Sequence, residues 1–485
     1  MNELFGYPRR ISSATPVGRK TFAWSIIMFN LNSSLVKKIS RRNLLEIGTL
    51  SALGVSLPNI LRADQNTKPV QAKSCIFIYQ YGGLSQLDSW DPKPDSPEGI
   101  RGPYKPIATK LPGFRVGELM PKLASKADKY TVIRSMSHTI PVHDIANRML
   151  LAGQSNPPLN APAFGSIVTK LKPSPGDIPS YVWLQKFGGG AAPPDNTYLS
   201  GGYLGMGNSP LLIGNTHLEN PSIPGFKINA FEPAGLSTEQ LANRIKLLSQ
   251  MEFSANQNKS HQSINEFRDK AFNILTGTKA KKAFDIEQEN LKTREQYGMH
   301  PMGQNLLLAR RLIESGVRTV GVVAWTGLAP KEKFVSLETW DMHGNAGISI
   351  FDNGWNGLGW ALPRCDEAVS ALLEDLETRG LLDSTLVVLV GEFGRTPKIS
   401  KGGSAIGRDH WPKCYSAMIA GGGAKKGLIY GASDSTAGYV KDNPVSPEDF
   451  AATLLTLLGI APETRLSPDG FTLPASLGTP IQGLI

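Results

Sequence analysis

The chain has 485 residues, of which 40% are hydrophobic, so it is long enough to bury a large core as one α/β domain with insertions or as two domains. This composition excludes a disordered chain. Residues 1–64 hold nine Lys or Arg and three acids, which leaves 42 basic and 38 acidic residues elsewhere. The net charge of +10 is therefore concentrated at the N-terminus, and nucleic acid is not expected as a partner.

The three cysteines, Cys75, Cys365 and Cys414, are odd in number and lack the spacing of a metal site. They cannot form a complete disulfide framework. We expect them to be buried free thiols.

The N-terminal segment contains Ser40-Arg41-Arg42-Asn43-Leu44-Leu45 ahead of a mildly apolar run to Leu61, which resembles a twin-arginine export signal. Glu46 and Pro58 interrupt this run and make it a poor membrane span. We therefore predict that residues 1–64 are an N-terminal extension and signal, and that the protein is exported to the periplasm or another extracytoplasmic space. An amphipathic helix with a chance arginine pair is the alternative. Cleavage of the signal or its retention as an anchor stays open.

Residues 74–81 form the first predicted strand, a short β-rich run that stops at Gly82-Gly83. The following loop carries Ser85, Asp88 and Asp91. Ligands of open α/β sheets bind outside the carboxyl ends of strands, so these polar residues are candidates for a site. The alternative for Asp91, which precedes a proline, is a structural turn.

A second strand is predicted over residues 131–136, followed by His138 and then by His143-Asp144. A helix over 145–151 follows and ends at Gly153, which favours a left-handed cap. The histidines thus lie between a strand and a helix N-terminus, where free N–H groups attract anions. Both histidines are open to a structural or a functional interpretation.

Residues 154–225 contain eleven Pro and eleven Gly, including Gly188-Gly-Gly190 and Pro193-Pro194. We interpret this stretch as long ordered loops over the edge of the sheet. Residues 237–294 are polar and favour helix, which predicts a peripheral helical insertion, with a disordered linker as the alternative.

The C-terminal half alternates helix and strand, the pattern of an α/β fold. We predict helices over 304–315, 362–376 and 446–459, and strands over 319–323, 386–390 and 416–420. Ser446-Pro-Glu-Asp449 resembles a capping box at the start of the last helix. Gly421-Gly-Gly423 after the last strand is a candidate anion-binding backbone loop.

Metal-ligating residue types gather in three loop segments of this half of the chain. Asp341 and His343 lie two residues apart, Glu392 follows the strand that ends at 390, and Asp409-His410 form an adjacent pair. Imidazole nitrogen and carboxylate oxygen are the ligands of a divalent transition ion. None of these pairs is specific alone, but their placement after alternating elements predicts one metal site.

Four motifs carry a family resemblance: Gly82-Gly83 with Asp88-x-x-Asp91-Pro92-Lys93, Trp340-Asp341-x-His343-x-Asn345, Gly391-Glu-Phe-Gly-Arg-Thr-Pro397 and Gly407-Arg-Asp-His-Trp411. Together they resemble the exported bacterial proteins of the domain of unknown function 1501 family, over nearly all of the chain from residue 40. That family is regarded as similar to sulfatases and alkaline phosphatases, which hydrolyse sulfate or phosphate esters at a one- or two-metal site. The resemblance implies an alkaline-phosphatase-like three-layer α/β/α sandwich with a central, mostly parallel sheet over residues 70–485, with loop and helical insertions around 154–300.

Carried over residue by residue, the resemblance implies a divalent metal held by Asp341, His343, Glu392 and His410, with zinc, calcium, magnesium and manganese not distinguished. Asp88 would be the early ligand, although it lies six residues past Gly82, whereas the superfamily aspartate directly follows its strand.

The nucleophile position departs from the superfamily. Sulfatases carry Cys or Ser ten residues before the Gly of a Leu-Leu-Thr-Gly ending, and His143 stands there, ahead of Leu150-Leu-Ala-Gly153. Asn147 stands where sulfatases have Arg, and Phe393 replaces the His of an Asp-His pair. An imidazole can be a ligand, a base or a nucleophile, but it excludes alkoxide chemistry at that position.

We therefore expect an exported metallohydrolase of a sulfate or phosphate ester, small or carbohydrate-borne. His143 would act as base or extra ligand, and Arg395 or Arg408 would hold the anion. Ser85 is the alternative replacement for the nucleophile. A catalytically inactive, sulfatase-like binding protein is the alternative function.

Overall fold

The computed structural model describes residues 71–485 apart from 176–177, 185–195, 215, 229–230, 232–236, 238, 241–242, 245, 248–249, 251–276, 329–339, 345–346, 402–403 and 467–472. The predicted signal in residues 1–64 therefore lies outside the described residues, as do Gly188–Gly190, Pro193–Pro194, Asn345 and most of the predicted 237–294 insertion. Residues 68–485 form one unit by their internal contacts.

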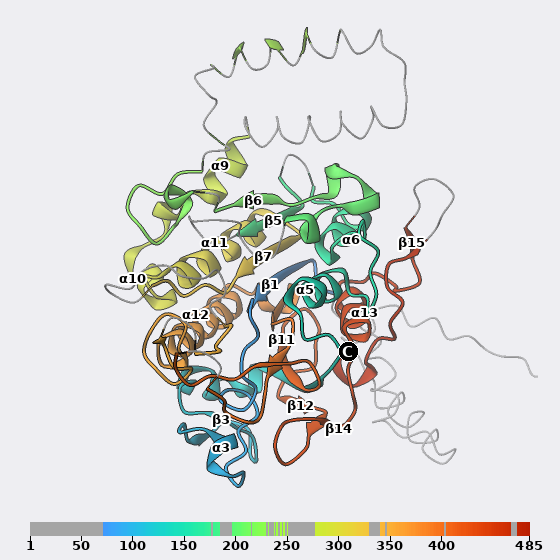
Figure 1. Ribbon diagram of the computed structural model, residues 1–485. Helices are drawn as coiled ribbons and strands as arrows, with labels where there is room; N and C mark the ends of the chain where they lie inside the picture. Colours follow the sequence, from blue (N-terminus) through green and yellow to red (C-terminus); the bar gives the residue numbers. More distant parts are fainter. Residues whose placement is uncertain are drawn as a thin grey trace, which may run out of the picture. The chain divides into compact units, whose positions relative to one another are not determined.

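An eight-stranded sheet lies at the centre of this unit, in the order β12-β4-β11-β8-β1-β7-β5-β6 (Figure 1). Its strands are β1 (Ser74–Tyr79), β4 (Tyr130–Met136), β5 (Tyr181–Leu184), β6 (Leu211–Ile213), β7 (Thr319–Val323), β8 (Thr385–Val390), β11 (Tyr415–Ala420) and β12 (Leu428–Tyr430). β1 pairs parallel with β7 and β8, and β5 pairs parallel with β6 and β7. β11 runs antiparallel to both of its neighbours, β4 and β8.

Helices cover both faces of the sheet (Figure 1). They are α3 (Glu98–Arg101), α4 (Pro121–Ala124), α5 (His143–Ala152), α6 (Phe164–Leu171), α9 (Thr278–Phe284), α10 (Leu291–Tyr297), α11 (Pro301–Ser315), α12 (Leu358–Thr378) and α13 (Pro447–Leu457). Four two-stranded ribbons complete the described part: β2 (Pro106–Ala108) with β3 (Arg115–Gly117), β9 (Gly394–Arg395) with β10 (His410–Trp411), β13 (Ala432–Ser433) with β14 (Val440–Asp442), and β15 (Arg465–Leu466) with β16 (Leu473–Pro474).

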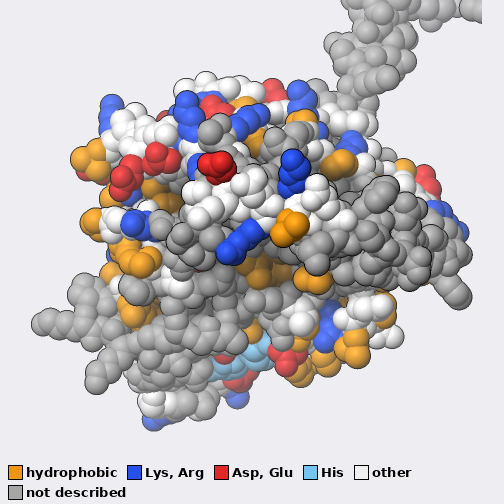
Figure 2. Space-filling view, turned by 90° about the horizontal axis from the view of Figure 1, so that it is seen from above, with side chains coloured by type: hydrophobic (Ala, Val, Ile, Leu, Met, Phe, Trp, Pro, Cys, Tyr) orange, Lys and Arg blue, Asp and Glu red, His pale blue; other side chains and the backbone are white. Residues whose placement is uncertain are grey.

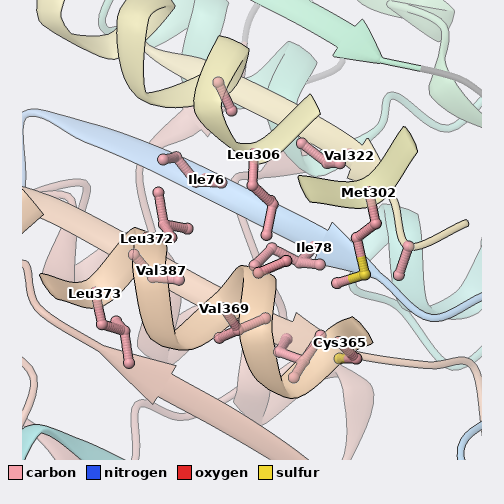
Figure 3. Close-up of a cluster of buried hydrophobic side chains, with 14 of the residues drawn as sticks. Ile76, Ile78, Met302, Leu306, Val322, Cys365, Val369, Leu372, Leu373 and Val387 are labelled. Carbon is pink, nitrogen blue, oxygen red and sulfur yellow. The ribbon is translucent and has the colours of Figure 1, made fainter. Parts of the chain in front are cut away.

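The alternation of side chains along β1 divides the core into two layers. Ile76 and Ile78 belong to the cluster that contains the apolar faces of α11 and α12, which Figure 3 shows packed on the same side of the strand. Cys75, Phe77 and Tyr79 belong to the second cluster, together with apolar residues of α5, α6 and α13. The predicted three-layer α/β/α arrangement with a mostly parallel sheet is confirmed. The cysteines are buried and free, as expected.

The strongly patterned elements lie where the sequence predicts them. The helix and strand pair α12 and β8 spans the predicted ranges with extensions of a few residues. α13 begins with the predicted cap, because Ser446 Oγ accepts a hydrogen bond from the Asp449 backbone N–H at 3.1 Å.

The interpretation of residues 154–225 as loops is wrong in part. This stretch contributes α6 and two strands of the central sheet, β5 and β6. β5 has only four residues, too few for a periodic signal. Its stability comes from long-range packing: a Cβ at Gly321 would lie 1.8 Å from the ring of Trp183, so the missing side chain admits the indole.

The Gly421-Gly-Gly423 loop, predicted as a candidate anion-binding loop, lies away from the cluster of metal-ligating residues. It follows the antiparallel strand β11, so it lies at the opposite edge of the sheet from the carboxyl ends of β1 and β8. Its backbone is engaged internally, since the Gly422 N–H donates to the Leu382 carbonyl and the Ala424 N–H to the Gly421 carbonyl.

The strand directions bring the predicted site residues to one edge. The carboxyl ends of β1, β4, β7 and β8 share that edge, and the start of β11 joins them because this strand runs the other way. Residues that follow the first four strands and residues that precede β11 therefore meet there.

Basic and acidic side chains are interspersed on the face shown in Figure 2, in keeping with the near balance of charge outside residues 1–64. Among the described residues, no helix has the combined length and apolar character needed to cross a membrane.

Candidate metal centre

Asp341 is the residue on which the cluster at this edge converges. Its Oδ1 lies 2.9 Å from His343 Nε2, 3.0 Å from His410 Nε2 and 3.3 Å from His143 Nε2. The side chains of these four residues are between 15% and 21% exposed, so the cluster is accessible from solvent. Three imidazoles and a carboxylate thus meet at one partly buried point.

Two of the imidazoles are oriented so that Nε2 faces this point. The His143 ring lies with Nδ1 2.7 Å from Glu392 Oε1, and the His410 ring with Nδ1 2.8 Å from the Pro141 carbonyl. Both partners can only accept, so each Nδ1 carries the hydrogen and each Nε2 is the free ligand atom. This is the arrangement in which a second hydrogen bond fixes the tautomer of a metal-binding histidine.

His343 is held in the same way by a third carboxylate. Its Nδ1 lies 2.9 Å from Asp409 Oδ1, and its Nε2 lies 2.8 Å from His410 Nε2. Asp409 is half exposed and also accepts from Ser400 Oγ at 3.2 Å. The sequence analysis considered Asp409 only as the neighbour of His410. Its contact with His343, 66 positions earlier, cannot be predicted from the local sequence.

Two glycines allow the loops to approach closely enough to build the cluster. Gly82 follows β1 with a φ of +105°, and a Cβ there would lie 2.3 Å from the backbone nitrogen of Asp341. A Cβ at Gly407 would lie 2.1 Å from the carbonyl carbon of His343. Side chains at either position would displace the cluster's backbone. The β9–β10 ribbon then sets His410 opposite Arg395.

The electrostatics of the cluster require a positive charge beside Asp341. Burial raises the pKa of the Asp341 carboxyl, but Arg395 and the three imidazoles outweigh this effect and hold that pKa well below its usual range. Burial lowers the pKa of His143, but its contacts with Asp341 and Glu392 dominate and raise that pKa to about 9. Burial lowers the pKa of His410. Without a metal, a proton on His143 therefore adds to the positive charge that Arg395 already places beside Asp341.

Glu392 occupies a different place from the one predicted. Its carboxylate is fully buried, and Oε1 accepts from the Gly82 N–H at 2.8 Å as well as from His143. Oε2 accepts from the Tyr79 hydroxyl at 3.3 Å. Glu392 therefore orients His143 and is not part of the three-residue group of ligand atoms formed by His143, Asp341 and His410.

The two arginines do not lie as the anion-holding prediction requires. All five N–H groups of Arg395 are used: they donate to Asp341 Oδ1 at 2.6 Å, to His343 Nε2 at 3.2 Å, and to the Gly82, Gly83 and Arg408 carbonyls. Its side chain is fully buried. Arg395 therefore holds the cluster together and leaves no N–H for a substrate oxyanion.

Arg408 and Asp88 form a separate buried pair. Arg408 Nε donates to Asp88 Oδ2 at 2.8 Å and Nη2 donates to Oδ1 at 3.2 Å, with both side chains fully buried. The remaining N–H groups of Arg408 donate to the Thr396, Pro397 and Ile100 carbonyls. Asp88 is thus engaged by a cation of the protein itself, and its predicted role as a ligand stays a prediction.

Ser85 and His138 are likewise structural. Ser85 is buried and its hydroxyl donates to Asp88 Oδ2 at 2.5 Å. His138 Nδ1 accepts from the Ile140 N–H at 3.2 Å, so its Nε2 donates to the Glu392 carbonyl at 2.6 Å. Neither side chain offers a free reactive atom to the cluster.

The donor set fits a divalent ion. Four-coordinate zinc has bonds of about 2.0–2.1 Å to nitrogen and oxygen, which place neighbouring ligand atoms about 3.3 Å apart. The separations of Asp341 Oδ1 from His410 Nε2 and His143 Nε2 are 3.0 and 3.3 Å. His143 Nε2 is buried and makes no hydrogen bond within the described part of the chain. A buried nitrogen aimed at a carboxylate and lacking a hydrogen-bond partner is what a bound cation would satisfy.

A family model described as "Protein of unknown function (DUF1501)" matches residues 72–474. The chain belongs to this family. The family resemblance predicted from the four motifs is thereby confirmed. Among curated proteins, none is significantly similar to the sequence.

Several solved structures of phosphatases and related enzymes are similar to the chain at low sequence identity. The lipoteichoic acid synthase LtaP from Listeria monocytogenes is 13% identical with a TM-score of 0.38, over 92% of this chain and 82% of that one. The alkaline phosphatase from the Antarctic bacterium TAB5 is 13% identical with a TM-score of 0.36, over 80% and 99%. The phosphonate monoester hydrolase SpPMH from Silicibacter pomeroyi is 12% identical with a TM-score of 0.35, over 80% and 73%. At these scores the matches carry no information on substrate or reaction.

Proposed function

We propose that the protein is a metal-dependent hydrolase that acts on a sulfate or phosphate ester. The observation that carries the proposal is the convergence of His143 Nε2, His410 Nε2 and Asp341 Oδ1 in one solvent-accessible group. Two imidazoles and one carboxylate are the protein ligands of a catalytic zinc site that keeps a position open.

A divalent ion bound there would polarise the ester oxygen and lower the pKa of a bound water. The imidazole-rich donor set favours zinc or another transition ion over calcium and magnesium, which prefer oxygen ligands. Glu392 and the Pro141 carbonyl hold the two histidine rings in the ligating orientation. His343, whose Nδ1–H is held by Asp409, is the candidate general acid or base beside the group.

The attacking group in this proposal is water rather than a serine or cysteine. His143 occupies the sequence position of the sulfatase nucleophile, and its Nε2 belongs to the group of ligand atoms. The Ser85 hydroxyl is buried and committed to Asp88. Hydrolysis would then proceed in one displacement, without a covalent ester of the protein.

The second candidate function is a metal-holding binding protein without turnover. It is favoured by the arginines, because neither Arg395 nor Arg408 retains an N–H that could bind the transferred group. In that case the cluster would bind an anionic group of a ligand and release it unchanged.

Metal analysis and ester turnover test the proposal and separate the two functions. The purified full chain should contain about one equivalent of a transition ion, and His410→Ala should remove both the ion and hydrolysis of aryl sulfate and aryl phosphate esters. Glu374→Gln is the control, since it changes an exposed carboxylate that pairs with Lys126 away from the cluster. Metal without turnover of any ester would establish the binding protein, and a metal-free chain would refute both.

Export belongs to the same proposal. The Ser40-Arg41-Arg42 motif supports transport of the folded, metal-loaded chain through the twin-arginine route. Replacing both arginines by lysine should leave the protein in the cytoplasm, as measured by cell fractionation; unchanged export of this variant would refute the assignment.

A further inference from the structure

A cavity lies on the face of the sheet that α11 and α12 cover, apart from the metal cluster. It has a volume of about 430 Å³ and is lined by residues from the start of α11, the first half of α12 and α4, among them Met299, His300 and Arg364. α11 precedes β7 and α12 precedes β8, so both helices begin near the edge at which these strands end. The cavity therefore lies near the same edge of the sheet as the cluster.

Arg364 is the cation of this cavity that forms no ion pair within the described residues. Burial lowers its pKa, although the nearby charge of Glu367 acts to raise it. Its guanidinium carbon lies 3.2 Å from the ring centre of Trp360, and its one hydrogen bond within the described part of the chain is from Nη1 to the Trp360 carbonyl at 3.3 Å. The indole is itself fixed, because Trp360 Nε1 donates to the Gly327 carbonyl at 2.8 Å. A guanidinium held flat on an aromatic ring presents a preorganised fork of N–H groups.

His300 lies in the wall of the cavity beside Arg364, with its Nε2 buried below the surface. Its Nδ1 accepts from the Gly303 N–H at 3.2 Å and caps α11, so its Nε2 carries the hydrogen. This Nε2 is buried without a hydrogen-bond acceptor, and the nearest carboxylate oxygen, on Glu367, is 3.9 Å away. Burial and the charge of Arg364 lower the pKa of His300 to about 3, so the ring stays neutral and keeps this tautomer.

The acids of the cavity are already neutralised or occupied. Glu367 is paired with Lys122 Nζ at 2.8 Å. Both oxygens of Asp366 accept backbone hydrogen bonds, from the Lys122 N–H at 2.9 Å and the Leu123 N–H at 2.7 Å. The group that remains without an ion pair or a second hydrogen bond within the described residues is the Arg364 guanidinium.

We propose that this cavity is a binding site for an oxyanion, with the Arg364 guanidinium as its donor. The ligand is a small molecule that carries a carboxylate, sulfate or phosphate. The apolar walls provided by Met299 and Pro363 would contact the carbon skeleton that bears the anion. The site is independent of the metal centre and of hydrolysis.

Isothermal titration of the full chain with inorganic phosphate, inorganic sulfate and acetate tests the proposal and separates tetrahedral from planar anions. Arg364→Gln should weaken binding of the preferred anion about tenfold or more, which is the loss expected for one charge-assisted pair. Arg364→Lys keeps the charge without the fork and should give an intermediate loss. Arg115→Gln, which removes an exposed arginine on β3, should bind like the parent chain.

Thermal melts of all four proteins show whether each variant is folded, and Arg364→Lys keeps the test informative if Arg364→Gln is not. The proposal is overturned if the Arg364 variants bind as tightly as the parent chain, because the anion would then sit elsewhere, such as at the metal cluster. It is equally overturned if the parent chain binds none of the three anions.

Discussion

The substitution Glu392→Gln distinguishes an orienting carboxylate from a metal ligand. Glu392 Oε1 accepts from His143 Nδ1 at 2.7 Å and from the Gly82 N–H at 2.8 Å, and neither oxygen belongs to the group of ligand atoms. Gln keeps the shape and one acceptor but removes the negative charge that makes the imidazole a stronger donor to the ion. Loss of such a partner costs about 10- to 100-fold in metal affinity, or about 1.4–2.7 kcal/mol.

The assay is a competition titration of the metal-free chain with zinc against a chromophoric chelator. His143→Ala removes a ligand and should lose more affinity than Glu392→Gln. Glu374→Gln is the matched control, since this carboxylate is exposed and pairs with Lys126 away from the cluster. If Glu392→Gln loses as much affinity as His143→Ala, then Glu392 is a ligand and the reasoning from the hydrogen-bond geometry is refuted.

Three further outcomes follow from the same contacts. The pKa of His143 is about 9 in the folded metal-free chain against about 6.5 unfolded, so its stabilisation is complete below about pH 6.5 and disappears as the pH rises through 9; denaturant melts should show this decline, and His143→Asn should flatten it. Asp409→Asn should weaken zinc binding less than Glu392→Gln does, because Asp409 is 52% exposed and water can replace it; an equal loss in titration would contradict this ranking. Gly82→Ala should destabilise the chain by about 1–3 kcal/mol in melts and lower its metal content, since its φ is positive and its Cβ would meet the Asp341 backbone; unchanged metal content would contradict the close approach.

The elements that the sequence predicts well are those whose stability is local or strongly periodic. α12 buries one apolar stripe, and its apolar residues recur at helical spacing. β8 is buried on both faces, and its sequence is a continuous apolar run. Both patterns can be recognised from the sequence alone. β5 and β6 have four and three residues and depend on partners far along the chain, so no pattern within the segment predicts them. The prediction of loops over residues 154–225 therefore misses both strands.

The site shows the same division at the level of side chains. The motifs and residue types predict that Asp341, His343 and His410 lie in one site, because the loops that carry them meet at one edge of the sheet. Their roles depend on which atom faces which, and the sequence carries no signal for that. The sequence predicts Arg395 as an anion-binding residue. In the folded chain all of its N–H groups donate to Asp341, His343 and backbone carbonyls.

Charge balance supports a divalent ion at this centre independently of the ligand distances. The cluster and its orienting groups contain three carboxylates, Asp341, Glu392 and Asp409, and one guanidinium, that of Arg395. Asp88 and Arg408 neutralise each other nearby. With neutral imidazoles the centre therefore has two excess negative charges, one of them on the half-exposed Asp409, and a proton on His143 cancels one. A dication restores neutrality, and burial of charge without compensation is costly. Because all N–H groups of Arg395 and Arg408 are committed to the protein, an anionic substrate group at this centre would have to be held mainly by that ion.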